Sequence, residues 1–227
     1  MHPFDTENGV RTSGIIPGRF LKTGHRHDRH STAYFGVAPS VFHGLLRRWQ
    51  KTKPCAPIEA FTFFDVGAGM GRAMLLASEL PFKRVAGIEL NPVLAAMARR
   101  NAAKWKVAGR AKSPMRVMCG DAAEFRFTEG PYVVFLFNPF GASVMRRLLE
   151  RIADAFQDRP GQVDLLYVNH EQEHVFEQRR GFVRLYLGQV KRSRADAIAD
   201  HRIMANQPDG EYAASNSEDC SIWRWEA

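Results

Sequence analysis

Short apolar runs alternate with helical stretches through most of the chain, and this alternation constrains the fold more than any other feature. The runs are rich in β-branched and aromatic residues, and most are apolar on both faces, as expected of strands covered on two sides. They predict seven strands, at residues 61–66, 84–90, 115–120, 132–137, 162–168, 182–190 and 220–225. Alternating strands and helices indicate an α/β fold, a doubly wound and mostly parallel sheet with helices on both faces.

Apolar residues at helical spacing fill the stretches between these strands. In "NPVLAAMARRNAAKW", Asn91 is placed to cap a helix and Pro92 to occupy its first position. The segment 143–156 carries its apolar residues on one face. Further helices are predicted from Pro39 to residue 49, after the glycine loop at residues 72–80, and around residues 171–178. Because no long helix is evident between the last two strands, we expect them to pair antiparallel at one edge.

Size and composition indicate one domain of ordinary size with its own apolar core. The chain has 227 residues, 45% of them hydrophobic and 25% charged. Three cysteines form no C-x-x-C pair, which disfavours a disulfide framework and a thiolate zinc site. The first residues lack the apolar region of a secretory signal, and no apolar run reaches the ~18 residues of a membrane span. We therefore expect a soluble, cytoplasmic protein with no membrane partner.

The chain is basic, with a net charge of +8 and several pairs of adjacent arginines. These charges are typical of solvated helix faces, and they are also compatible with an acidic partner such as RNA or an acidic protein surface. No nucleic-acid motif accompanies them. The basic N-terminal segment "GHRHDRH" (24–30) places three histidines at close spacing. Since no acidic or cysteine partner lies at ligand spacing, we predict a solvated arm and no metal site.

A glycine loop, "DVGAGMG" (65–71), lies where the first strand meets the following helix. Its glycines allow a tight turn and a close approach to a ligand. The P-loop pattern, with its Lys-Ser/Thr pair, is absent. The dinucleotide pattern G-x-G-x-x-G/A is also broken, because the loop reads G-x-G-x-G and continues with Arg72. In addition, the carboxylate of Asp65 would repel a pyrophosphate and attract a ligand with a positive end.

S-adenosylmethionine is such a ligand, because it has an ammonium, a sulfonium, two ribose hydroxyls and no phosphate. Glu89 ends the second strand, where a carboxylate can accept hydrogen bonds from both ribose hydroxyls. Asp121 follows the third strand and can reach the adenine amino group, with backbone groups around Ala122 reading the ring. Each acid alone could be a turn residue or a solvated strand end. All three lie at the carboxyl ends of strands, where open α/β sheets bind ligands.

Four segments, "FFDVGAGMGRAMLLAS", "VAGIELNPVLAAMARRN", "CGDAAEF" and "VVFLFNPFG", together resemble the successive motifs of class I, seven-stranded S-adenosylmethionine-dependent methyltransferases. The resemblance covers about residues 31–227. It implies a Rossmann-like sheet of order 3-2-1-4-5-7-6 with strand seven antiparallel. We therefore predict three parts: an irregular basic N-terminal arm (1–30), inferred from its Gly, His and Arg content and weak periodicity, a helical segment that covers the cofactor site (31–52) and the methyltransferase domain (53–227).

The resemblance implies which residues hold the cofactor. Tyr34 is a candidate lid residue, since an aromatic before the first strand often covers the cofactor in relatives with a similar segment. Arg72 either contacts the methionine carboxylate or points to solvent. The full set of expected cofactor-binding residues is Tyr34, Asp65, Gly67, Ala68, Gly69, Gly71, Glu89, Leu90, Asp121, Ala122 and Asn138.

The tetrapeptide "NPFG" ends the fourth strand, beside the methyl group in this fold. Amino-methylating members carry [N/D]-P-P-[Y/F] there, with side-chain and backbone oxygens that accept hydrogen bonds from the target amine and a ring that packs on the substrate. Here one proline is missing, so Phe140 lies one place earlier than the aromatic residue of that motif. The segment is also similar to the Asn-Asn-Phe type of histone lysine methyltransferases. It could equally be a plain turn. We take Asn138, Pro139 and Phe140 as candidate catalytic residues. His170 and Glu171 face the same rim, where capping or solvated roles are expected.

Together these features predict a methyltransferase that uses S-adenosylmethionine and transfers a methyl group to nitrogen, in an amine or amide of a protein, RNA or small molecule. Two alternatives remain open. One is a nicotinamide-dependent Rossmann oxidoreductase, and the other is a non-catalytic module that uses its basic surface to bind RNA or protein. The sequence does not identify the methyl acceptor.

Overall fold

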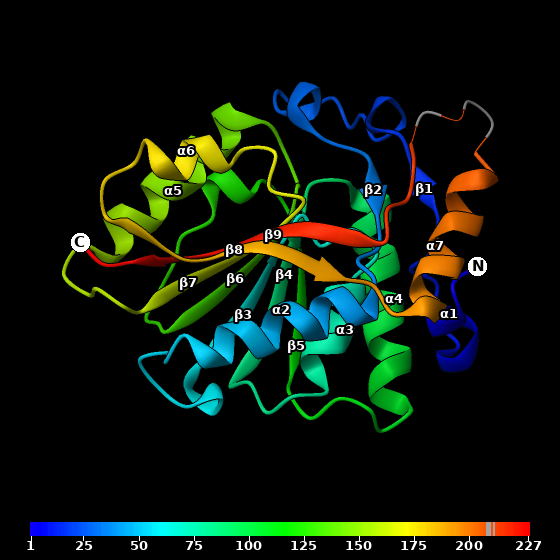
Figure 1. Cartoon of the computed structure of the whole chain (residues 1–227), viewed down its shortest axis with the longest axis horizontal. Helices are drawn as coiled ribbons and strands as arrows, with labels where there is room; N and C mark the ends of the chain where they lie inside the picture. The colour runs from blue at the N-terminus through cyan, green and yellow to red at the C-terminus, as the bar shows by residue number, and fades with distance from the viewer. Residues whose placement is uncertain (208–209, 211) are drawn as a thin grey trace.

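A computed structural model describes residues 1–207, 210 and 212–227, and within these residues seven strands form one sheet (Figure 1). The order is β5-β4-β3-β6-β7-β9-β8, and only β9 runs antiparallel to its neighbours. This confirms the predicted order and the antiparallel last strand. The strands are β3 (Thr62–Val66), β4 (Arg84–Glu89), β5 (Met115–Cys119), β6 (Tyr132–Phe137), β7 (Val163–Val168), β8 (Phe182–Lys191) and β9 (Ser217–Trp225).

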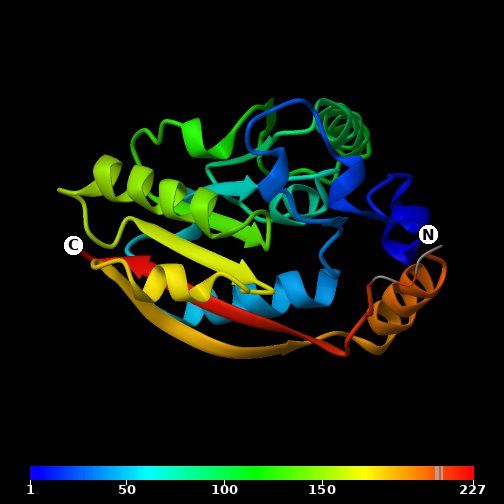
Figure 2. The same ribbon diagram turned by 90° about the horizontal axis from the view of Figure 1, so that it is seen from above.

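Helices cover both faces of the sheet (Figure 2). On one face α2 (Pro39–Lys51), α3 (Arg72–Ser78) and α4 (Pro92–Val107) contribute to a core that includes Phe63 and Phe135. On the other face α5 (Ala142–Phe156) and α6 (Glu173–Glu177) pack over a second core. Successive residues of a central strand point to opposite faces, which explains why both faces of these strands are apolar.

The prediction that no long helix separates the last two strands is wrong. A helix, α7 (Arg194–Ala205), connects β8 to β9. Ser193 caps it by accepting a hydrogen bond from the backbone N–H of Asp196. Most of its apolar residues are alanines, and charged residues interrupt them, so the helical period was weak. The antiparallel pairing of β8 and β9 is nevertheless confirmed, with a bulge between Arg184 and Tyr186.

The N-terminal segment is folded and partly buried, in contrast to the irregular arm expected from its sequence. It forms α1 (Pro3–Asn8), two short 3₁₀ turns (Gly18–Phe20 and Asp28–His30) and a two-stranded ribbon of β1 (Ile15–Ile16) and β2 (Tyr34–Phe35). Two further 3₁₀ turns, Ile58–Ala60 and Ala122–Glu124, precede β3 and follow β5. The division of the chain at residues 30 and 52 stays a prediction.

A polar cluster explains why α1 is held against the sheet domain. The buried carboxylate of Asp5 accepts hydrogen bonds from the backbone N–H groups of Thr12 and Ser13 and from the Thr12 hydroxyl, at 2.5–2.7 Å. Phe4 packs on Trp105 of α4 with ring centroids 5.5 Å apart. Figures 1 and 2 both place α1 beside α7, at the end of the sheet where β8 leads into α7.

Arg72 also belongs to this cluster, and the prediction that its side chain points to solvent is wrong. Its side chain is only 2% exposed, so it does not point to solvent. It donates to the Thr12 hydroxyl (2.7 Å), the Ser13 hydroxyl (3.0 Å) and the Gly36 carbonyl (3.1 Å), and it lies 3.7 Å from Asp5. Arg72 therefore ties the N-terminal segment to the start of α3. No helix of the described residues is long and apolar enough to cross a membrane.

Candidate functional site

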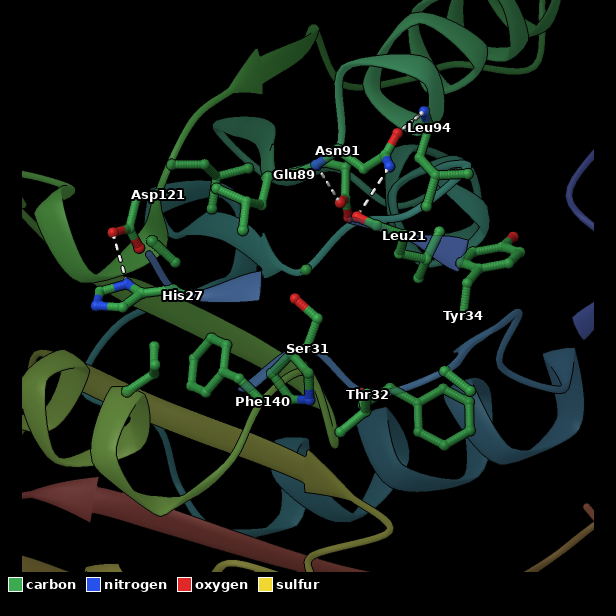
Figure 3. Close-up of a pocket in the computed structure, with 18 of the residues that line it drawn as sticks. Leu21, His27, Ser31, Thr32, Tyr34, Glu89, Asn91, Leu94, Asp121 and Phe140 are labelled. Carbon is green, nitrogen blue, oxygen red and sulfur yellow. Dashed lines mark hydrogen bonds and ion pairs between the residues drawn. The ribbon is translucent and has the colours of Figure 1, made fainter. Parts of the chain in front are cut away.

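A cavity opens at the carboxyl ends of β3, β4, β5 and β6 (Figure 3). We call it the first cavity, and its volume is about 100 Å³. Residues 21–35 cross its open side, and we call this segment the strap; Leu21, His27 and residues 31–35 contribute to the lining. Since parallel strands bring their carboxyl ends to one edge, loops from distant parts of the sequence meet here.

The three glycines of the loop have backbone angles that favour glycine, with φ of 74° at Gly67, 54° at Gly69 and 89° at Gly71. Each is also crowded by a different neighbour. A Cβ at Gly67 would lie 2.7 Å from Pro139, and a Cβ at Gly69 would lie 2.2 Å from the Tyr34 ring. Gly71 faces Ala98 of α4 instead. The loop is therefore shaped by the "NPFG" segment, by the strap and by helix packing.

Glu89 is fixed by the glycine loop at the floor of the first cavity. One carboxylate oxygen accepts a hydrogen bond from the Gly69 N–H, and the other accepts one from the Asn91 N–H, both at 2.8 Å. Burial raises the pKa of this carboxyl above its usual value. Each oxygen has a further lone pair, so the carboxylate can still accept hydrogen bonds from a ligand in the cavity.

Asp65 lies beneath the loop, at the fourth position of β3, and is 4% exposed. Burial, with a further contribution from the nearby Glu89 carboxylate, raises the pKa of Asp65 to about 8. No ion pair or side-chain hydrogen bond joins it to another described residue. A buried acid without a partner is costly, and a cationic ligand nearby would favour its ionised form.

Asp121 holds the strap in place. One of its oxygens accepts the N–H of Ala123 at 2.9 Å, and the other lies 2.8 Å from Nδ1 of His27 and 3.9 Å from Nε2 of His25. The prediction that the histidines form a solvated arm without an acidic partner is therefore wrong. The partner comes from a loop about 95 residues away in the chain, a distance over which spacing rules carry no information.

These three side chains could also hold a metal ion, since their ligand atoms all lie within 4.8 Å of one another. Nδ1 of His25 accepts the backbone N–H of His27 at 3.2 Å, so the proton of a neutral His25 ring resides on Nε2. Nδ1 of His27, 2.8 Å from Asp121, makes the closer of the two contacts between the strap and this carboxylate. We interpret the cluster as a latch between the strap and Asp121.

The "NPFG" segment also contacts the strap. The Asn138 carbonyl accepts the Thr32 hydroxyl at 2.5 Å, Phe140 pairs with Ser31 in a β-bridge, and the Gly141 N–H donates to the His30 carbonyl at 3.0 Å. Asn138 has a φ of 38°, in the left-handed region that asparagine tolerates better than most residues. Such an outlier at a strand end is common at functional sites.

The side chain of Asn138 is buried, and its amide oxygen has no hydrogen-bond partner among the described residues. Asn138 lines a second cavity of about 590 Å³ on the other side of the strap. The two cavities share a wall made of Phe137 and of three strap residues, Thr32, Ala33 and Phe35. The first cavity is thus placed to hold one ligand and the second to hold another, with Asn138 at the junction.

The structure brings together most, but not all, of the residues expected from the sequence. Tyr34, Gly67, Glu89, Leu90, Asp121, Ala122, Pro139 and Phe140 line the first cavity. Ala68, Gly69, Gly71 and Asp65 are not among its described lining residues, and Asn138 lines the second cavity. His170 pairs with Glu173 at 2.9 Å, and Glu171 lines the second cavity.

Sequence reasoning missed the strap residues Leu21, His27, Ser31 and Thr32. Their positions depend on contacts with loops far along the chain, and only the unusual histidine spacing marked the segment. It also missed Asn91 and Leu94, whose helix start was predicted correctly from the Asn-Pro pair but not assigned to the site.

Neither a protein-family model nor a curated protein matches the chain. Solved structures do match. A candidate RNA methyltransferase of Pyrococcus horikoshii is 18% identical over 82% of this chain and 83% of its own, with a TM-score of 0.51. Magnesium protoporphyrin IX methyltransferase of Synechocystis, with S-adenosylmethionine bound, is 12% identical over 82% and 78%, with a TM-score of 0.52.

TrmN of Thermus thermophilus is 16% identical over 83% of this chain but only 49% of its own, with a TM-score of 0.53. At such low identities these similarities show a shared fold. The chain has the fold of class I methyltransferases, with the seven-stranded sheet and the antiparallel last strand that the sequence predicted.

Proposed function

We propose that this protein is an S-adenosylmethionine-dependent methyltransferase that methylates nitrogen. The observation that carries the proposal is the convergence of Asp65, Glu89 and Asp121 around the glycine loop, beside an unpartnered asparagine amide at the next strand end. Three acids with no phosphate-binding cation among the described lining residues suit a ligand that is cationic and lacks phosphate.

Each acid is assigned one part of the cofactor. Glu89 accepts hydrogen bonds from the ribose hydroxyls, Asp121 and the backbone near Ala122 contact adenine, and Asp65 compensates the positive charge of the methionine end. Tyr34 covers the loop at Gly69. The sulfonium supplies a reactive methyl group, so the protein has only to align the nucleophile and exclude water.

Binding of a ligand of this size requires the strap to move. Sites for drug-sized ligands usually have about 300–1,000 Å³, whereas the first cavity has about 100 Å³. The contacts of His27 with Asp121 and of Thr32 with the Asn138 carbonyl hold the strap down. Release of both would free Asp121 for adenine and the Asn138 carbonyl for the methyl acceptor, so one movement prepares both halves of the site.

The oxidoreductase alternative is disfavoured because the pyrophosphate of a nicotinamide cofactor would lie near the glycine loop and its buried acids. The alternative of a non-catalytic module predicts that nothing is methylated. The test is to incubate the protein with methyl-labelled S-adenosylmethionine and a cell lysate, with Asn138→Ala as the paired variant. We expect label in acid-stable material with the wild type only; equal labelling by both proteins would contradict the role of Asn138.

A further inference from the structure

The second cavity has a charge opposite to that of the protein as a whole. The chain carries a net charge of +8, yet three carboxylates, those of Glu171, Glu218 and Asp219, line this cavity. Arg192 is the one cation among the described residues of the lining. Glu171 and Asp219 are exposed, so they can meet a ligand that enters from solvent.

Arg192 does not compensate these acids, because its charge is already paired. Its side chain is 3% exposed and lies in ion pairs with both Asp200 and Glu218, the first at 2.9 Å. The same guanidinium also donates to the Ser215 hydroxyl at 2.9 Å and to the Ser217 carbonyl at 3.3 Å. Two carboxylates thus face one guanidinium, and Glu171 and Asp219 have no cationic partner among the described residues.

Asn138, which lines this cavity, carries a hydrogen-bond acceptor without a donor in the described part of the chain. Asn138 is 8% exposed, and its amide oxygen is buried without a partner among the described residues. Leaving such a group unpaired is unfavourable, and a ligand that donates N–H groups to it once the strap has moved would remove that cost. Phe137, next to Asn138, belongs to the wall shared with the first cavity. A group held by Asn138 therefore lies next to the site proposed for the cofactor.

We infer that the methyl acceptor is a protonated aliphatic amine that enters through the second cavity, with Glu171 and Asp219 attracting its charge and Asn138 holding its nitrogen. This inference rests on the proposed methyltransferase function and specifies its substrate class. An amine at the end of a flexible chain, as in a lysine side chain or a free polyamine, has the required chemistry. A phosphate-rich substrate such as RNA would be repelled at this entrance.

The reaction is balanced with this acceptor. The ammonium loses one proton to water in the solvent-connected cavity, and the neutral amine then attacks the methyl carbon. A nitrogen–carbon bond forms while the carbon–sulfur bond breaks, and its electron pair stays on sulfur. The products are a methylated ammonium, S-adenosylhomocysteine and one released proton. No oxidant or further reactant is needed.

The experiment uses the full chain, methyl-labelled S-adenosylmethionine, and three acceptors: Nα-acetyl-lysine methylamide, spermidine and total RNA, beside a whole lysate. The labelled lysate is separated into protein, RNA and small molecules and hydrolysed in acid. We expect the label in N-methylated aliphatic amines, either as methyl-lysine from protein or as a free methylated amine. Label in a nucleoside, an amide or an ester would overturn the inference while the methyltransferase function stands.

Variants of the entrance give an independent readout. In the double variant Glu171→Gln/Asp219→Asn, KM for the labelled amine should rise roughly 10-fold, with kcat and S-adenosylhomocysteine affinity changed less than about twofold. Glu177→Gln, which removes one exposed charge from α6 outside the cavity, is the control and should leave KM unchanged. Unchanged KM in the double variant would overturn the inference, as would cofactor binding without amine labelling. Failure to bind the cofactor at all would instead refute the proposed function.

Discussion

The substitution Asp65→Asn should stabilise the ligand-free protein in a way that depends on pH. Burial raises the pKa of Asp65 from 3.8 to about 8, so the native state keeps a proton that the unfolded state has already released. The free energy of unfolding therefore falls between about pH 4 and about pH 8. The decrease is about 1.4 kcal/mol per pH unit. At pH 7 this loss amounts to about 4 kcal/mol, and the Asn variant avoids it.

Urea unfolding of the wild type and of Asp65→Asn at several values between pH 4 and pH 9 measures this effect. The free energy of unfolding of the variant minus that of the wild type should grow through this range and level off above about pH 8. Asp154→Asn, at an exposed position of α5, provides the same chemical change without burial and should show no such growth. A difference that is constant from pH 4 to pH 9 would show that Asp65 is ionised throughout.

The same carboxyl links cofactor binding to protons. A ligand with an ammonium group favours the ionised form of Asp65, so its binding at pH 7 should release up to one proton and its affinity should rise toward pH 8. Calorimetry in buffers of different ionisation enthalpy counts the released protons. Asp65→Asn should bind the cofactor more weakly and release fewer protons; equal release by both proteins would remove Asp65 from the site.

Three further substitutions test the rest of the site. Glu89→Ala should lower the affinity for S-adenosylhomocysteine by roughly 1.5–3 kcal/mol per lost hydrogen bond at most, and unchanged affinity in calorimetry would exclude a ribose contact. Asn138→Ala should leave that affinity nearly intact while the single-turnover rate falls on the order of 10²-fold; a folded variant with the wild-type rate would mean that "NPFG" is only a turn. Gly69→Ala should cost about 1–3 kcal/mol of stability, and part of that loss should disappear when Tyr34→Ala removes the ring 2.2 Å from the new Cβ. Additive losses in this double-mutant cycle would show that the strap does not rest on the loop there.

The sheet could be predicted from the sequence because each strand is specified locally. Runs such as 132–137 are apolar on both faces and end at glycine, proline or asparagine, so both their type and their bounds are marked. The Asn91-Pro92 pair likewise marked the start of α4. The order of the strands came from the family resemblance, since strand pairing over long separations leaves no local pattern.

The strap and α1 could not be predicted, because long-range polar contacts stabilise them. Asp5 binds Thr12 and Arg72, and His27 binds Asp121, yet each of these residues alone is typical of a solvated segment. The acidic entrance of the second cavity was missed for the same reason. Glu171 and Asp219 lie 48 positions apart in the chain and meet only after β7 and β9 pair.

Calorimetric titration of the full chain with S-adenosylhomocysteine, with NAD titrated in parallel, shows which of the two cofactor classes the first cavity binds. We expect a single site for S-adenosylhomocysteine that is weakened in Glu89→Ala, and no binding of NAD. Saturating S-adenosylhomocysteine should also raise the melting temperature, because the ligand binds only the native state. Binding of NAD with none of S-adenosylhomocysteine would contradict the assignment of the three acids to a cationic cofactor without phosphate.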